Sequence, residues 1–407
     1  MPSIRYGVPP WLDAVPVKKR REFPAFRGVI SHPVVILGGG MSGAMTAYAC
    51  ASAGYKVILL EADRIGLGGS GRATGLLSGE ACDSYRTLES RAGKRAARAM
   101  FDAMQSAPRE LAATVKRLGI RAGFDPADHL RVVPAGESDK LIRRELAARQ
   151  AAGVKASWVV PATVAREAAI ASGGAMRLPD AGFVDPFKLT LGFLNAAIKR
   201  GAKVYEKSRV RKITFTRKTA TAYLDGGSIT TTNLAICIGE PTALFKPLKR
   251  HLRHEHRYVV LTEQLPPMVR AELGQRTSVV IDTDAPPHHL WFTADNRAVF
   301  AGGDQKRPPD RLREKTLVQR TGQLMYELST LYPDISGLQP DFGWAADYAR
   351  TAEGLPYLGP HRNFPWHLFA FGDSSHSVTG AYLASRVLLR HYFEEMDPAD
   401  ELFAFTR

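Results

Sequence analysis

"VVILGGGMSGAMTAYACASAGYKVILLEA", residues 34–62, is the stretch that decides the fold. Its first four residues are apolar without polar alternation, which is typical of a strand buried on both faces. Glycines at 38, 40 and 43 follow, then a helix with small residues on one face, and a second apolar strand that ends at Glu61. This order predicts a strand-helix-strand unit. Its glycine-rich turn either binds a phosphate group or only connects the strand to the helix.

The acidic residue after the second strand favours phosphate binding. Glu61 stands where a carboxylate accepts hydrogen bonds from the two hydroxyls of an adenosine ribose. The glycines let a pyrophosphate approach the N-terminus of the helix, where free N–H groups attract anions. We therefore predict a dinucleotide site with contacts from Gly38, Gly40, Met41, Ser42, Gly43, Glu61 and Ala62.

A second glycine-rich segment, "ADRIGLGGSGRATGLLSGE" at 62–80, indicates which dinucleotide binds. The two segments together resemble the FAD-dependent oxidoreductases of the D-amino acid oxidase and glycine oxidase superfamily, in which an "iG-x-G-(A/S)-S-x-R-x-x-G" stretch follows the first unit. The corresponding positions hold Ile65, Gly66, Gly68, Ser70, Arg72 and Gly75. NAD enzymes of the simple Rossmann type lack this stretch, so the resemblance implies FAD. It adds contacts from Gly68, Ser70, Arg72, Ala73 and Thr74.

The middle of the chain is similar to the same family. Residues 180–213 match its helix, its strand and its adenine-contacting valine, which is Val210 here. "NLAICIG" at 233–239 corresponds to the strand whose last glycine, Gly239, passes the phosphates of the cofactor.

Two segments near the C-terminus extend the resemblance. In the family, the counterparts of "RTAEGLPYLGP" at 350–360 and "FAFGDSSHSVTG" at 369–380 lie along the ribityl chain and isoalloxazine ring of the flavin. The resemblance therefore implies cofactor contacts from Gly354, Leu355, Gly372, Ser375, His376 and Thr379.

The sequence also departs from the family pattern. Glu353 replaces the usual aspartate, and residues 373–376 read Asp-Ser-Ser-His where relatives often have glycines or asparagine. Many amino acid oxidases of the superfamily grip a substrate carboxylate with an arginine on the strand before "GG-x-D", and the aligned residue here is Phe292. Arg257, from a neighbouring strand, is a substitute clamp. A simple α-amino acid substrate is therefore less strongly implied than the flavin fold.

Four side chains are candidates for the substrate site: His376, Trp291, Tyr348 and Arg257. A neutral imidazole at position 376 would hold an amine or tune the flavin ring, or would only bond the backbone of the turn. Trp291 and Tyr348 either line the substrate cavity or belong to the core. Thr379 either bonds the pyrimidine edge of the flavin or caps the last helix.

Composition limits the class of protein. The 407 residues are 45% hydrophobic, enough for a large core, and no run approaches the length of a membrane span. Three cysteines have neither metal nor redox spacing and predict no disulfide framework, which fits a reducing cytoplasm. We expect no metal. The net charge of +15 indicates either solvated faces or attraction to an anionic partner, and without an RNA-binding motif we expect no nucleic-acid partner.

We predict an α/β (α+β, two-domain) fold, in which a Rossmann-like FAD-binding domain is interleaved with an antiparallel-sheet substrate domain. The predicted divisions are an N-terminal arm at 1–29, cofactor-binding segments at 30–85, 160–242 and 340–395, substrate-domain segments at 86–159 and 243–339, and a tail at 396–407. The first substrate-domain segment is predicted to be mostly helical, with Met100 and Met104 in its core.

The resemblance implies an FAD-dependent oxidase or dehydrogenase that oxidises the C–N bond of an amino acid, an N-substituted amino acid or an amine by hydride transfer to flavin N5. Oxygen or another acceptor would reoxidise the flavin. FAD is expected to be non-covalent, because the usual attachment residues are missing. Two alternatives stay open: a flavin-binding protein without turnover, and a flavoprotein that acts on or docks to RNA or another macromolecule. Substrate, acceptor and oligomeric state do not follow from the sequence.

Overall fold

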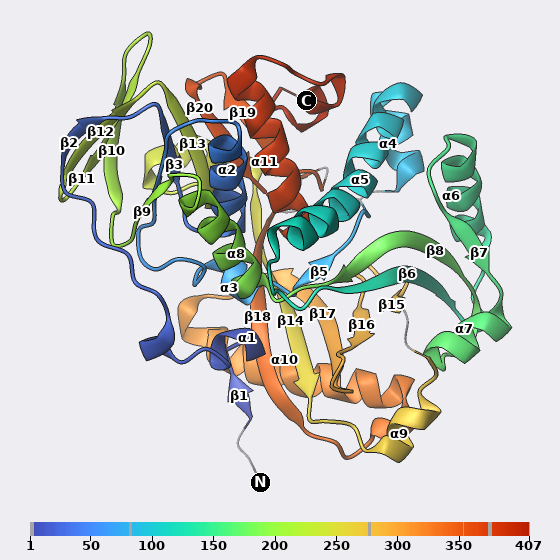
Figure 1. Ribbon diagram of the computed structural model, residues 1–407. Coiled ribbons are helices and arrows are strands. Elements are labelled where there is room, and N and C mark those ends of the chain that lie inside the picture. The colour runs from blue at the N-terminus through green and yellow to red at the C-terminus, as the bar shows by residue number, and fades with distance from the viewer. Residues whose placement is uncertain (1–3, 81–83, 276–277, 353, 373–376, 407) are drawn as a thin grey trace.

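The computed structural model describes residues 4–80, 84–275, 278–352, 354–372 and 377–406. Within them, the strands form three sheets of six, four and ten strands (Figure 1). The six- and four-stranded sheets lie together on one side of the molecule, and the ten-stranded sheet curves away from them.

The six-stranded sheet is the nucleotide-binding core predicted from residues 34–62. Its order is β19 (Tyr357–His361), β20 (Phe364–Phe371), β13 (Asn233–Gly239), β3 (Val34–Leu37), β4 (Val57–Leu60) and β9 (Lys203–Tyr205). All neighbours are parallel except β19 and β20. Every residue of β3 and β4 is buried, as the absence of polar alternation predicts.

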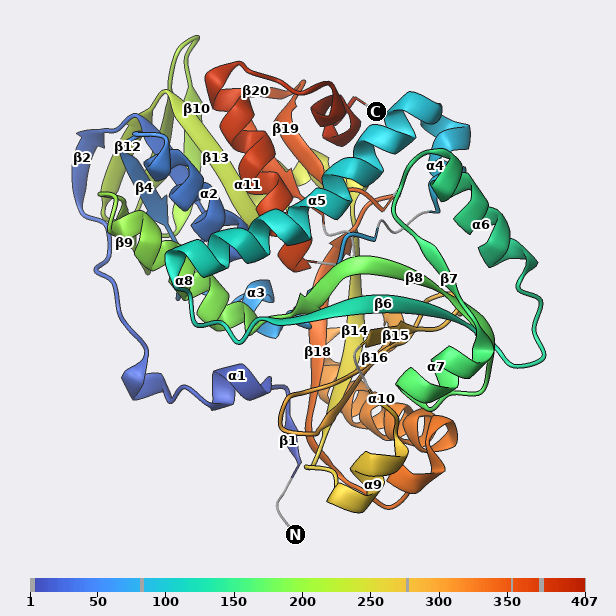
Figure 2. The ribbon, with the colours of Figure 1, turned by 45° about the vertical axis from the view of Figure 1, so that its right-hand side comes forward.

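Three helices cover one face of this sheet: α2 (Met41–Ser52), α8 (Pro186–Ile198) and α11 (Ser377–Phe393) (Figure 2). The alanines at 44, 47 and 51 of α2 are buried, so small side chains let this helix lie close to its neighbours. α2 packs against α11, although α11 follows more than 300 residues later in the chain.

The other face of the six-stranded sheet is covered by the four-stranded sheet. Its order is β10 (Val210–Phe215), β11 (Ala220–Leu224), β12 (Gly227–Thr231) and β2 (Gly28–Ser31), with β12 and β2 parallel. The two sheets bury one apolar cluster that includes Ile58, Ile236 and Ile229. A hairpin turn at Asp225 and Gly226 joins β11 to β12.

The ten-stranded sheet is mostly antiparallel. Its order is β1 (Arg5–Tyr6), β18 (Pro340–Arg350), β14 (Arg253–Thr262), β17 (Ala298–Lys306), β16 (His289–Phe292), β15 (Ser278–Ile281), β6 (Asp125–Pro134), β8 (Ser172–Phe183) and β5 (Leu76–Leu77), with β7 (Ser157–Val159) on β8. Two of its pairings are parallel, those of β1 with β18 and of β15 with β6.

Helices surround the ten-stranded sheet. Helix α10 (Asp310–Leu331) buries Leu317, Leu324 and Leu328 against one face. Helix α5 (Lys94–Leu118) crosses toward α11 and buries Met100 and Met104, as predicted. The shorter helices are α1 (Pro10–Asp13), α3 (Gly69–Arg72), α4 (Tyr85–Ala92), α6 (Lys140–Ala151), α7 (Pro161–Ala168) and α9 (Pro267–Glu272), with 3₁₀ turns η1 (Val17–Lys19), η2 (Ala243–His251), η3 (Pro333–Ile335) and η4 (Pro398–Phe403).

Strand membership differs from the predicted division. β5, β8 and β18 fall in predicted cofactor-binding segments, and β1 falls in the predicted N-terminal arm, but all four pair in the ten-stranded sheet. β6 is a ten-residue strand in a segment predicted to be mostly helical. Each of these strands pairs with partners distant in the sequence, which local periodicity does not reveal. The domain boundaries themselves stay a prediction.

Candidate functional site: a cofactor cavity

A cavity of about 890 Å³ opens where β3, β4 and β13 end. Its wall includes Leu37, Leu60 and Gly239, which are the carboxyl-terminal residues of these parallel strands. Ligands of open parallel sheets bind in such crevices. The predicted cofactor residues on the wall are Gly38, Gly40, Met41, Ser42, Glu61, Ala62, Gly68, Ser70, Arg72, Val210, Gly239 and Gly372.

One end of the cavity is built from backbone at the start of α2. Gly40 is the N-cap and supplies no side-chain cap, while the N–H of Met41 donates to Ser70 Oγ at 2.9 Å. Gly38 has φ +106°, and a Cβ there would lie 2.2 Å from the carbonyl oxygen of Cys237. A Cβ at Gly43 would lie 1.9 Å from the carbonyl oxygen of Gly38. Only glycine fits at these two positions, so the backbone around the helix terminus stays open to a phosphate.

Glu61 lies beside this end of the cavity. Its Oε2 accepts from the N–H of Gly39 at 2.7 Å, and its Oε1 accepts from the N–H of Asp63 at 2.8 Å. These two bonds fix the carboxylate next to the glycine-rich turn. Val210, predicted to contact the adenine, lines the same cavity. The residues present therefore fit the adenosine and pyrophosphate of a dinucleotide.

The opposite end of the cavity is formed by Gly372 and by the first turns of α11, through Ser377, Gly380 and Ala381. Thr379 belongs to this turn but does not line the cavity. Its hydroxyl donates to the carbonyl of Ser78 at 2.7 Å and accepts from the N–H of Ser78 at 3.0 Å. These bonds correspond to neither predicted role, a contact with the flavin or a helix cap. They link α11 to Ser78, which follows β5.

Five more predicted cofactor residues lie off the cavity wall: Gly43, Ala73, Thr74, Gly354 and Leu355. Gly43 acts through close packing on Gly38. Thr74 Oγ1 accepts from the N–H of Leu76 at 3.3 Å, and the carbonyl of Leu355 accepts from Thr351 Oγ1 at 2.8 Å. These bonds shape the chain beside the cavity. Ser375 and His376, and with them the first catalytic candidate, lie outside the described residues, as does Glu353.

Tyr348 lines the cavity, as one of its two predicted alternatives required. Its hydroxyl lies 2.6 Å from Asp304 Oδ2 and 2.9 Å from Glu255 Oε2. Burial raises the pKa of Tyr348, and the negative charge of Asp304 raises it further, so the phenol stays protonated.

Arg257 lies behind Tyr348 and does not line the cavity. Its Nε and Nη2 donate to the two oxygens of Asp304 at 2.8 and 2.7 Å, and both side chains are only 4% exposed. The guanidinium is therefore already paired with a protein carboxylate. Its predicted role as a substrate clamp would require that pair to separate.

The remaining substrate-site candidates lie in packed regions. Trp291 is 5% exposed and stacks on Phe183, with ring centroids 4.5 Å apart. It fits the alternative of a core residue. Phe292, aligned with the family arginine, packs in the cluster under α10 near Tyr332.

A polar wall of the cavity was not predicted from the sequence. It comprises Glu240, His254, Arg307 and Asp347. Asp347 lies 2.6 Å from His256 Nε2 and 3.6 Å from Arg72. Burial alone would raise the pKa of Asp347, but the nearby His256, Arg307 and Arg72 together outweigh burial and lower the pKa. These residues come from segments far apart in the chain, so no local motif marks them.

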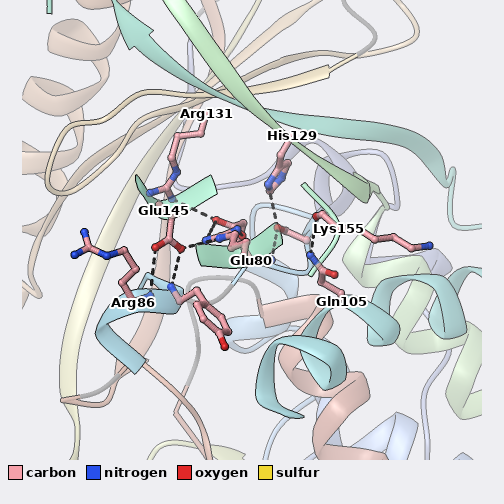
Figure 3. A network of polar contacts seen from close by, with 10 residues as sticks. Glu80, Arg86, Gln105, His129, Arg131, Glu145 and Lys155 are labelled. Carbon is pink, nitrogen blue, oxygen red and sulfur yellow. Dashed lines mark hydrogen bonds and ion pairs between the residues drawn. The ribbon is translucent and has the colours of Figure 1, made fainter. Parts of the chain in front are cut away.

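A buried charged cluster surrounds Glu80, in the segment that follows β5 (Figure 3). Arg149 is 1% exposed and bonds Glu80, while its Nε donates to Glu145 at 2.7 Å. Arg131 lies 3.7 Å from Glu80. Burial alone would raise the pKa of Glu80, but Arg149 and Arg131 outweigh it and lower the pKa. Ser78 Oγ lies 3.1 Å from Nδ1 of His129 in the same region. The cluster joins α6 and β6 to the segment that follows β5.

Among the described residues, one group of side chains has the geometry of a metal site. Ligand atoms of Asp282, Asp284 and His288 lie within 4.8 Å of one another. His288 Nδ1 already pairs with Asp282 at 2.7 Å, and this hydrogen bond raises the pKa of the histidine. The group lies in the segment between β15 and β16 and contributes nothing to the cofactor cavity.

The family described as FAD dependent oxidoreductase (DAO) matches residues 33–390, nearly the whole chain. The chain belongs to this family. It is an FAD-dependent oxidoreductase, and its cofactor is FAD. This confirms the family resemblance, the fold class and the cofactor predicted from the sequence.

Relatives of this oxidoreductase are similar over almost their whole length. Gamma-glutamylputrescine oxidoreductase of Escherichia coli K12 is 26% identical over 94% of this chain and 89% of its own. Glycine oxidase of Geobacillus kaustophilus HTA426 is 24% identical over 92% of this chain and 96% of its own.

Solved structures share the fold of this oxidoreductase. Glycine oxidase from Geobacillus kaustophilus superposes with a TM-score of 0.76 at 19% identity, covering 93% of this chain and 99% of its own. L-Amino acid deaminase from Proteus myxofaciens gives 0.76 at 17% identity, covering 95% and 96%. None of the described helices is both long and apolar enough to cross a bilayer.

Proposed function

We propose that this oxidoreductase oxidises the carbon–nitrogen bond of an amine, an amino acid or an N-substituted amino acid. The observation that carries the proposal is the continuous cavity that extends from Glu61 and Val210 to Gly372 and the start of α11, with Tyr348 on its wall. The names of the relatives support the substrate class, since they include an oxidoreductase of gamma-glutamylputrescine and an oxidase of glycine.

The residues of the cavity have separable roles in this proposal. The N-terminus of α2 holds the pyrophosphate, where Gly38 and Gly40 leave the backbone accessible. Glu61 accepts hydrogen bonds from the ribose. Tyr348 contacts the substrate end. When bound, FAD supplies the acceptor for a hydride from the carbon next to nitrogen.

We expect FAD to be held without a covalent bond. Among the described cysteines, Cys237 lines the cavity. Burial raises the pKa of Cys237 to about 12, so its thiol is not ionised at neutral pH and is a poor nucleophile. Denaturing the protein should therefore release free FAD into the filtrate, with no flavin left on the precipitated chain.

An anaerobic absorbance scan tests the proposed function. The purified protein is scanned and then mixed with amino acids, N-methyl amino acids and amines in turn. Bleaching of the flavin bands by any of them supports C–N oxidation, and admitting air then separates an oxidase from a dehydrogenase. A yellow protein that no compound bleaches contradicts the proposal and favours flavin binding without turnover, or action on a macromolecule such as RNA.

The cytoplasmic location and the absence of a nucleic-acid partner stay predictions from composition. Steeply salt-dependent RNA binding by the purified protein would contradict the second.

A further inference from the structure

We infer that Thr379 is a positioning residue, which fixes the start of α11 against the cofactor cavity and thereby sets the reduction potential of the bound flavin. The inference goes beyond the proposed function, because it concerns the cofactor and holds for any substrate. Its basis is a pair of hydrogen bonds that join α11 to the chain after β5, at the end of the cavity opposite Glu61.

The two bonds take the place of a strand partner where β5 ends. β5 pairs with β8 through Leu76 and Leu77, and the next residue, Ser78, is fully buried. Its N–H donates to Thr379 Oγ1 at 3.0 Å, and its carbonyl accepts from the same hydroxyl at 2.7 Å. Thr379 is also fully buried, so without its hydroxyl both backbone groups of Ser78 would lose these partners away from water. The bonds therefore hold α11 firmly to Ser78.

Ser78 is itself held from a second side, by the buried charged cluster (Figure 3). Its Oγ accepts from the N–H of Glu80 at 3.0 Å and lies 3.1 Å from Nδ1 of His129. Glu80 in turn pairs with Arg149 and Arg131. Because these contacts come from α6 and β6, Ser78 cannot follow a movement of α11. It is a fixed point to which the helix is tied.

The first turns of α11 face the cavity, through Ser377, Gly380 and Ala381. Since Glu61 and Val210 at the other end fit the adenosine of FAD, this end is left for the flavin ring. The first N–H groups of a helix have no partner within the helix and carry partial positive charge. A flavin gains negative charge when it is reduced, and nearby positive charge stabilises that state. The placement of the helix start therefore bears on the reduction potential.

The test measures the midpoint potential of the FAD-loaded protein, by anaerobic reduction together with a dye of known potential and without a substrate. Thr379→Val keeps the shape of the side chain but removes the hydroxyl, so the start of α11 is released from Ser78. We expect the potential to fall, by an amount equal to about a fivefold smaller equilibrium constant for reduction, as for the loss of a helix-terminus interaction. Thr379→Ser keeps the hydroxyl and should restore the wild-type potential.

Thr321→Val is the matched control. Thr321 is also a buried threonine within a helix, and its hydroxyl donates to the carbonyl of Leu317 at 2.9 Å. It belongs to α10 and does not line the cavity, so its replacement should leave the potential unchanged. A purely structural role for Thr379 would lower stability without moving the potential. A folded, FAD-loaded Thr379→Val protein with the wild-type potential overturns the inference, as does an equal shift in Thr321→Val or no recovery in Thr379→Ser.

Ser78→Ala decides the question if Thr379→Val does not retain FAD. This variant keeps both backbone bonds to Thr379 but removes the Oγ that contacts His129 and Glu80. We expect its potential to fall by a smaller amount, because the point to which α11 is tied is held less firmly. An unchanged potential would overturn the inference. No substrate is present in these measurements, so their outcome is independent of the bleaching experiment that tests the proposed function.

Discussion

The six-stranded and the ten-stranded sheets use different chemistry at the same cavity. The six-stranded sheet contributes backbone: the ends of β3, β4 and β13, three glycines and the N-terminus of α2. The ten-stranded sheet contributes side chains, among them Tyr348 and Asp347 of β18. Backbone contacts suit a cofactor that is the same in every member of the family. Side chains, in contrast, can be substituted to bind another substrate while the sheet keeps its backbone. In our proposal, the six-stranded sheet holds the cofactor and the ten-stranded sheet selects the substrate.

The largest expected effect is on the backbone side of this comparison. Gly43→Val should abolish FAD binding, because even the first carbon of the side chain would lie 1.9 Å from the carbonyl oxygen of Gly38. The measurement is the flavin absorbance of the purified variant after incubation with FAD. Gly322→Ala is the control, since nothing lies within 4 Å of a Cβ there and the φ angle is ordinary. A Gly43→Val protein with full flavin content would show that close packing of α2 does not form the site.

The next largest effect is a loss of stability when a buried charged side chain is removed. Arg149→Met should lower the free energy of unfolding by about 3 kcal/mol, because Glu80 and Glu145 would be left buried without their closest cation. Urea unfolding at pH 7 measures it. Arg98→Met, which removes an ion pair whose partners are both 53% exposed, should cost no more than about 1 kcal/mol. Equal costs would mean that burial of the charged cluster is energetically unimportant.

We also expect the stability difference between the wild type and Arg149→Met to depend on pH. The folded-state pKa of Glu80 is lowered from 4.5, so its contribution is present above pH 4.5 and is lost as the pH falls through the lower folded-state value. Without Arg149, less positive charge opposes the effect of burial on the pKa of Glu80. The contribution of Glu80 to stability then disappears. The stability difference between wild type and Arg149→Met should therefore narrow below pH 4.5, as followed by urea unfolding at stepwise pH. A gap that widens in acid would contradict the assignment.

Glu61→Gln tests the cofactor side more gently. The amide can still accept hydrogen bonds, but the charge that the N–H groups of Gly39 and Asp63 hold in place is removed. We expect the dissociation constant for FAD to rise about tenfold, as for a charge-assisted hydrogen bond that becomes neutral. Fluorescence titration of apoprotein with FAD measures it. An unchanged constant would remove Glu61 from the set of ribose-binding residues.

The smallest expected effect is on how stability depends on pH, through the protonation of a histidine in the six-stranded sheet. Burial lowers the pKa of His367 from 6.5 to about 4. The folded protein therefore resists a proton that the unfolded chain takes up, and stability is lost as the pH falls from 6.5 toward 4. His367→Phe, in a cluster with Phe364 and Phe369, should make this part of the stability curve flatter. Thermal unfolding at pH 7, 6, 5 and 4 checks it, and parallel curves for the two proteins would contradict it.

The family, the fold class and FAD could be predicted from the sequence, because the residues of each motif are close together in the chain. Glycines at 38, 40 and 43 and Glu61 belong to one unit, and twelve predicted cofactor residues line the cavity. Prediction was weaker where the contacts join residues that are far apart in the sequence. The polar wall pairs Arg72 with Asp347, and the partner of Arg257 is Asp304, 47 residues away. Charged residues look alike in a sequence whether they face solvent or each other, so these pairs carried no signal.

The role of Thr379 shows the same limit in one side chain. Its position in the last glycine-rich turn favoured a contact with the flavin or a helix cap. Its hydroxyl instead bonds the backbone of Ser78, 301 residues earlier. The family pattern located the turn but not the direction of the side chain.

The interleaving of the sheets has a consequence for how the protein is made. β20 pairs with β13 in the middle of the six-stranded sheet, and α11 lies against α2. A ribosome synthesises the glycine-rich turn early, but the strands and helix that complete its cavity emerge about 300 residues later, so the sheet cannot close during most of translation. The apolar strands of the unfinished chain therefore stay exposed until synthesis is nearly complete. Free FAD can assist folding only at that last step. Bound FAD should then stabilise the finished protein and not the growing chain.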